Sequence, residues 1–163
     1  MTNRSPRASK DQLVASSVQE GRRSPTGRHD SLDRGRMPKV HAPYRIGEHG
    51  GDFDAAPETL STAQAERLLG YLQSAECLVA APGWIEDPFA PDHTRSGVRI
   101  GVMTDGEWVW PLAWHDYVNW YRAAPPSDFM DHVQAHGWVA PPLSEDRISA
   151  VMRRLGMPDE FDE

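Results

Sequence analysis

The stretch VRIGVMTDGEWVWP, residues 98–111, decides the fold class of this chain. Val98, Ile100 and Val102 alternate with other side chains, which is the period of a half-buried strand. The dipeptide Asp105-Gly106 is typical of two-residue type I′ turns, and a Trp-rich segment follows it. The sequence therefore predicts a β-hairpin with strands over residues 98–103 and 107–111.

A two-residue turn also predicts the register of this hairpin. The predicted pairs are Thr104 with Glu107, Met103 with Trp108, Val102 with Val109 and Gly101 with Trp110. Since alternate side chains of a strand share a face, Met103, Trp108 and Trp110 lie on one face and Val109 joins the aliphatic side chains on the other. Both faces are apolar near the turn, so we expect helices or a partner to cover both.

Helical periodicity and capping signals predict four helices around the hairpin. They cover residues 62–76, 112–122, 128–137 and 145–155, with Ser127 or Asp128 as the cap of the third helix. The apolar run Cys77–Ala81 predicts a short buried strand with an inert thiol, and residues 138–140 predict an edge strand. Few strands and no βαβ alternation favour an α+β class, with a short antiparallel sheet packed against about four helices.

Charge divides the chain into two parts. Residues 1–45 contain ten Lys or Arg and four Asp or Glu, whereas residues 46–163 contain seven basic and twenty acidic side chains. The first part is rich in Arg, Ser, Pro and Gly and has a single aromatic side chain, so we expect disorder there. We predict a basic tail over 1–45 and one acidic domain over 46–163, with Met37 as an alternative start.

The location of the protein is predicted from missing signals. Cys77 is the only cysteine, which rules out an internal disulfide and favours a reducing compartment. The longest apolar runs are far shorter than the roughly 18 residues that a membrane helix needs. The basic N-terminus lacks the apolar core of a secretory signal. We therefore expect a cytoplasmic protein with no membrane contact.

Aromatic side chains crowd residues 108–121, and they are the first candidate for a binding site. Trp and Tyr are enriched at interfaces because each joins a large apolar body to a polar tip. A small domain also uses such side chains as its core, so both interpretations stay open for Trp108 and Trp110. Trp120 lies off the apolar stripe of its helix and is the best candidate for an exposed aromatic. These three, with Asp105 and Glu107 at the hairpin tip, are the predicted partner-binding residues.

The histidines are the second candidate. His132 and His136 are four residues apart, so both project from one helical face and are weak candidates for metal ligands. Apolar positions share that face, and contact with the edge of the core is the simpler interpretation. Nucleotide-binding, hydrolase and CxxC motifs are absent, so we predict no cofactor and no catalytic residue. The alternative is a small metal-dependent or acid–base enzyme using His115, His132, His136 and the loop 84–97.

The string TDGEWVWP at 104–111, with Tyr117-Val118 and residues 126–129, resembles small uncharacterised proteins of actinobacteria. Some of these look like immunity proteins encoded beside polymorphic toxins. The resemblance covers roughly residues 75–140 and implies a non-enzymatic protein-binding module that neutralises a toxin, without implying catalytic residues. The acidic domain suits a basic partner and would repel nucleic acid. Nucleic-acid binding through the basic tail is a further alternative.

Overall fold

The computed structural model describes residues 37–90 and 97–158. The described elements are, in order, β1 (Lys39–His41), β2 (Tyr44–Arg45), β3 (Asp52–Asp54), α1 (Thr62–Ser74), β4 (Glu76–Ile85), β5 (Val98–Thr104), β6 (Trp108–Pro111), α2 (Ala113–Tyr121), α3 (Ser127–Ala135) and α4 (Glu145–Arg154). Four helices and two small antiparallel sheets confirm the predicted α+β class.

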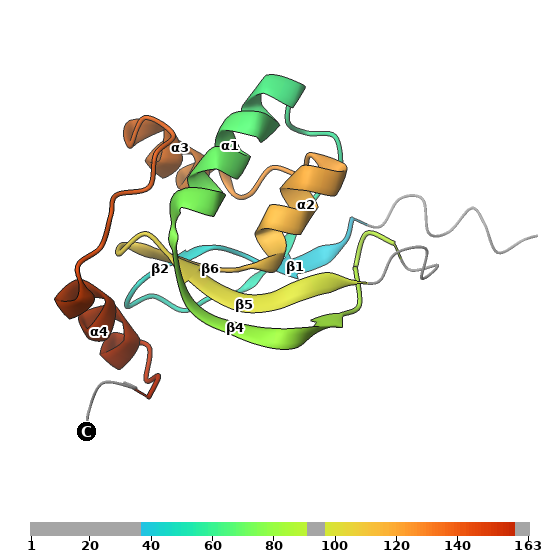
Figure 1. Ribbon diagram of the computed structural model, residues 1–163. Coiled ribbons are helices and arrows are strands. Elements are labelled where there is room, and N and C mark those ends of the chain that lie inside the picture. The colour runs from blue at the N-terminus through green and yellow to red at the C-terminus, as the bar shows by residue number, and fades with distance from the viewer. Residues whose placement is uncertain (1–36, 91–96, 159–163) are drawn as a thin grey trace, which may run out of the picture. The chain divides into compact units, whose positions relative to one another are not determined.

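The larger sheet carries the hairpin. Its strands lie in the order β2-β6-β5-β4, and the smaller sheet pairs β1 with β3. Figure 1 shows α1, α2 and α3 on one side of the larger sheet, whereas α4 lies apart from them, near the end of the sheet where β4 begins. A cluster of buried hydrophobic side chains, including Tyr71, Trp108, Trp110, Trp114 and Phe129, forms the core.

The hairpin is where it was predicted, but the predicted register is wrong by two residues. The observed pairs are Val102 with Pro111, Met103 with Trp110 and Thr104 with Val109. Gly106 adopts a positive φ of 92°, whereas Asp105 does not, so the type I′ turn is not formed. Instead, the carboxylate of Asp105 accepts the backbone N–H groups of Glu107 and Trp108, which lengthens the turn.

A shift of two residues preserves the faces of a strand, because side chains repeat with period two. Met103, Trp108 and Trp110 therefore share a face as predicted, and all three are buried in the core. The neighbour of Gly101 does change. Leu112, rather than Trp110, lies over Gly101, and its N–H donates to the Gly101 carbonyl oxygen at 3.0 Å.

The helices agree closely with the prediction, since their signals are local. Ser61 and Gln64 form the predicted capping box of α1, and the hydroxyl of Ser144 caps α4. Tyr71 of α1 is fully buried, whereas Leu69 is partly buried. Within the described ranges, no helix combines the length and the apolar character that a membrane span requires.

The ordered domain begins before residue 46, so the predicted boundary is wrong. β1 and β2 precede that residue, Tyr44 pairs with Val109, and Val40 is buried in the core. The indole Nε1 of Trp114 donates to the carbonyl oxygen of His41 at 2.9 Å. Backbone pairing of this kind does not depend on an apolar pattern, and composition therefore missed it. The rest of the predicted tail, residues 1–36, lies outside the described residues.

β4 differs most from its prediction. It has ten residues instead of five, continues through Pro82-Gly83, and is exposed at every position except the partly buried Leu78. Since β4 is an edge strand, a proline can point its missing donor away from the ladder. Cys77 is exposed rather than buried, because it lies on this edge strand. Residues 138–140 form no strand.

Candidate functional site

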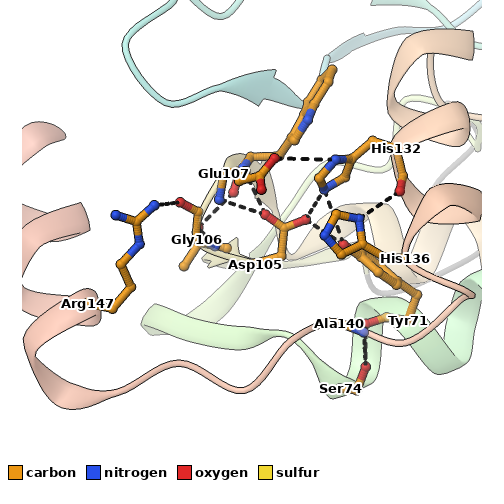
Figure 2. Close-up of polar contacts among 11 residues, drawn as sticks. Tyr71, Ser74, Asp105, Gly106, Glu107, His132, His136, Ala140 and Arg147 are labelled. Atoms are coloured by element: carbon orange, nitrogen blue, oxygen red, sulfur yellow. Dashed lines mark hydrogen bonds and ion pairs between the residues drawn. The ribbon is translucent and has the colours of Figure 1, made fainter.

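A buried carboxylate, Asp105, joins the hairpin tip to two helices (Figure 2). Its Oδ1 atom accepts the backbone N–H groups of Glu107 at 2.9 Å and Trp108 at 2.8 Å. Its Oδ2 atom lies 2.5 Å from the hydroxyl of Tyr71, on α1, and 2.6 Å from Nε2 of His132, on α3. All four neighbours are positioned as donors, so every acceptor direction of Asp105 is occupied.

The protonation of this network follows from its contacts. Burial alone would raise the pKa of Asp105, but the hydrogen bonds from Tyr71, the two backbone N–H groups and His132 outweigh burial and hold the pKa below its usual range. Burial and the same carboxylate raise the pKa of Tyr71. An ionised carboxylate only accepts, so the Tyr71 hydroxyl and Nε2–H of His132 both donate to it.

The second ring nitrogen of His132, Nδ1, lies near an exposed carboxylate. Nδ1 lies 3.7 Å from Oε2 of Glu107, and the Glu107 side chain is 59% exposed. The His136 ring lies against that of His132 in a tilted arrangement, with ring centroids 4.3 Å apart and planes at 51°, and its Nδ1 lies 2.9 Å from the His132 carbonyl oxygen. Both predicted metal ligands thus have protein partners. Among the described residues, no group of three or more His, Cys, Asp or Glu is arranged to hold a metal ion.

A second buried carboxylate, Asp116 of α2, binds Arg99 of β5. Nη2 of Arg99 lies 2.9 Å from Oδ1 of Asp116, and the backbone N–H of Arg99 donates to Oδ2 at 3.0 Å. Nη2 also donates to Nδ1 of His115 at 2.7 Å. Burial would raise the pKa of Asp116, but the neighbouring His115 ring and the hydrogen bonds from Arg99 lower it to about 2. This cluster anchors α2 on the sheet and holds His115 apart from the network of His132.

Both carboxylates predict an acid-sensitive fold. A carboxyl whose pKa is lower in the folded than in the unfolded state stabilises the fold above the unfolded value, and this stabilisation is lost as pH falls through the folded value. For Asp116 the two values are 3.8 and about 2. The difference corresponds to a contribution on the order of 2 kcal/mol at neutral pH.

We therefore expect the free energy of unfolding to decrease as pH falls from about 5 toward 2. Urea denaturation at a series of pH values measures this decrease. Asp116→Asn removes one titrating group, so the variant should show a shallower dependence on pH than the parent protein. Equal slopes in the two proteins would contradict the assignment.

The structure places the predicted partner-binding residues mostly inside the protein. Trp108 and Trp110 are 2% and 1% exposed, and Trp120 is partly buried against the core. Asp105 is 2% exposed and holds the turn. Glu107 is the most exposed of these five residues, all of which the structure describes. The tryptophan face of the hairpin is therefore covered by helices of the same chain.

The loop predicted over residues 84–97 is divided. Trp84 and Ile85 belong to β4, and residues 91–96 lie outside the described part. Asp87 is buried and accepts the hydroxyl of Tyr121 at 2.5 Å and the backbone N–H of Phe89 at 2.9 Å. Its contacts are those of a structural carboxylate that fastens this segment to α2.

A groove lies between β4 and α4. Its volume is about 700 Å³, within the range of ligand sites. It is lined by Glu76, Cys77, Leu78, Val79, Ala80, Glu145, Ile148, Met152, Met157 and Pro158. None of these residues takes part in the Asp105 network. Sequence reasoning missed the groove because a short apolar run predicts a buried strand, and only the order of strands shows that this one lies at an edge.

No protein-family model matches this chain, and no curated protein and no solved structure matches it either.

Proposed function

We propose that this protein is a non-enzymatic protein-binding module of the immunity type, and that its partner is a basic protein such as a toxin. One observation carries the proposal: β4 exposes apolar side chains along a sheet edge with which no other described strand pairs. Val79, Trp84 and Ile85 are 41%, 55% and 50% exposed. Contiguous exposed apolar surface marks interaction sites, and an unpaired edge invites another chain.

Charge supports a basic partner. The described residues include eight Lys or Arg and fifteen Asp or Glu, and twelve of the acidic side chains are exposed. A surface of one sign attracts a partner of the other sign and accelerates association, most strongly at low salt. An exposed apolar strand on an acidic domain thus combines a contact surface with steering.

The enzyme alternative finds no assembled site among the described residues. His115 bonds to Arg99, whereas His132 bonds to Asp105 and the loop carboxylate Asp87 bonds to Tyr121. The Asp105 carboxylate has no free acceptor direction for a substrate proton. The tail alternative concerns residues 1–36, which the structure does not describe, and it stays a prediction.

Titration against the product of the neighbouring gene tests the proposal. We expect binding, an association rate constant that falls as salt rises, and loss of the partner's toxicity when both are expressed. Trp84→Ala should weaken binding by about tenfold or more, since exposed aromatic side chains dominate interface energies. Glu66→Gln, an exposed change on α1, is the matched control and should bind nearly as the parent does. The proposal would be contradicted if the protein encoded by the neighbouring gene were not toxic and did not bind this protein.

A further inference from the structure

The outer edge of β4 has an open backbone. β4 is the last strand of its sheet, and β5 pairs with its inner edge only. Among the described residues, no backbone hydrogen bond reaches the outer edge from another segment. Within the part of the chain that the structure describes, the outward N–H and C=O groups of residues 77–81 thus have no backbone partner, and an added strand could bond to them.

Residues 77–81 of this edge lack the usual protection against pairing. Edge strands are generally protected by charged side chains, proline or a covering segment. Residues 77–81 contain neither charge nor proline, and Pro82 comes only after them. Residues 77–80 also line the groove, and Glu145, Ile148 and Met152 of α4 line it opposite them. A groove between an edge strand and a helix is a geometry in which extended peptides bind by strand addition.

The groove combines an apolar lining with two carboxylates. Leu78, Ile148 and Met152 contribute apolar surface, while Glu76 lines it from β4 and Glu145 from α4. Neither carboxylate forms an ion pair with another described residue. A bound segment that carries both apolar side chains and a Lys or Arg would complement this lining.

We propose that a partner binds here as an extended segment that adds a strand to β4 along residues 76–80. Its apolar side chains enter the groove, and its Lys or Arg side chains lie beside Glu76 and Glu145. This inference rests on the proposed function and names the mode of binding and the chemistry of the bound segment.

Charge decides between such a segment and a second copy of this chain. Two β4 strands could pair edge to edge, but residues 76–86 contain no basic side chain. A second β4 strand would therefore bring no cation of its own to Glu76 or Glu145, whereas a basic segment pairs with both. The basic partner is therefore the favoured occupant.

Synthetic peptides test the mode of binding. The probe is an acetylated and amidated octapeptide of alternating Val and Lys, titrated into the full chain and followed by amide NMR and calorimetry. We expect shifted resonances in β4 and α4, and slower amide exchange in residues 77–81. A Val–Glu octapeptide should bind at least about tenfold more weakly. N-methylation of alternate peptide nitrogens removes strand donors and should abolish binding.

Variants separate the two features of the groove. Glu76→Gln combined with Glu145→Gln should lower the affinity for the Val–Lys peptide by about tenfold. The affinity for a Val–Thr octapeptide should stay unchanged. Glu66→Gln is again the control, since it removes one exposed charge from α1. Equal affinity of the N-methylated peptide, or shifts confined to another surface, would overturn the inference.

Failure of this mode and failure of the proposed function have different signatures. If the whole partner binds while the peptides do not, and the double Gln variant has no effect on the partner, the groove mode is wrong and the binding function stands. If the whole partner does not bind the parent protein, the function itself is wrong. A concentration-dependent dimer with protected amides in residues 77–81, without peptide, would overturn the inference in favour of self-pairing.

Discussion

Asp105→Ala is expected to reduce the free energy of unfolding by about 3–5 kcal/mol. The substitution removes the acceptor of four hydrogen bonds, from Tyr71, His132 and the backbone N–H groups of Glu107 and Trp108. These donors are largely buried, so water does not replace the lost partner fully. The same change also releases the hairpin tip from α1 and α3.

Urea or guanidinium denaturation at neutral pH measures this effect, and two variants calibrate it. Tyr71→Phe removes one donor and leaves the carboxylate with three, so we expect a loss of about 1.5–3 kcal/mol. Glu107→Gln changes an exposed side chain beside the network and should alter stability by less than about 0.5 kcal/mol. A loss below about 1 kcal/mol for Asp105→Ala would show that the network does not hold the hairpin.

Trp110→Ala is expected to destabilise the protein by about 3–5 kcal/mol, because it opens a large cavity in the core. Trp110 is 1% exposed and contacts Tyr71 and Phe129, with ring centroids 6.3 and 5.2 Å away. Trp84 is the matched control, since it is the same residue type but 55% exposed. Trp84→Ala should change stability by less than about 0.5 kcal/mol.

The two tryptophan variants together separate core from interface. Trp110→Ala should lower the free energy of unfolding, whereas Trp84→Ala should leave it nearly unchanged. Trp84→Ala should instead lower the affinity for the partner while the protein stays fully folded. The reverse pattern, with Trp110→Ala stable but unable to bind, would restore the tryptophan face of the hairpin as the interface. It would also contradict the assignment of that face to the core.

The sequence determined the features that depend on neighbours along the chain. Alternation over residues 98–103 placed β5, and the serine caps at residues 61 and 144 placed the starts of α1 and α4. The faces of the hairpin were also predictable, because side-chain period survives a register shift of two. These signals are local, so no knowledge of packing was needed to interpret them.

The candidate site was only partly predictable. Asp105, His132 and Glu107 were all identified from the sequence, but as members of different groups with different roles. Tyr71 was missed because it lies outside the apolar stripe that the i, i+3, i+4, i+7 spacing of α1 predicts, which consists of Ala65, Leu68, Leu69 and Leu72. Its hydroxyl needs a partner when buried, and that partner is distant in sequence. The hydrogen-bond network joins residues of α1, α3 and the hairpin, which are distant in sequence, so no local pattern predicts it.

The hairpin's own register and surroundings were decided by tertiary structure alone. Asp-Gly predicts a two-residue turn, but the buried carboxylate of Asp105 bonds more favourably to the backbone and two helices, and it sets the longer turn. Apolar sequence likewise cannot distinguish a covered strand from an edge strand. Helices of the chain cover the tryptophan face, while the order β2-β6-β5-β4 leaves Cys77–Ala81 at an edge. The burial of a strand depends on contacts with segments distant in sequence, and the local pattern of residues does not indicate those contacts.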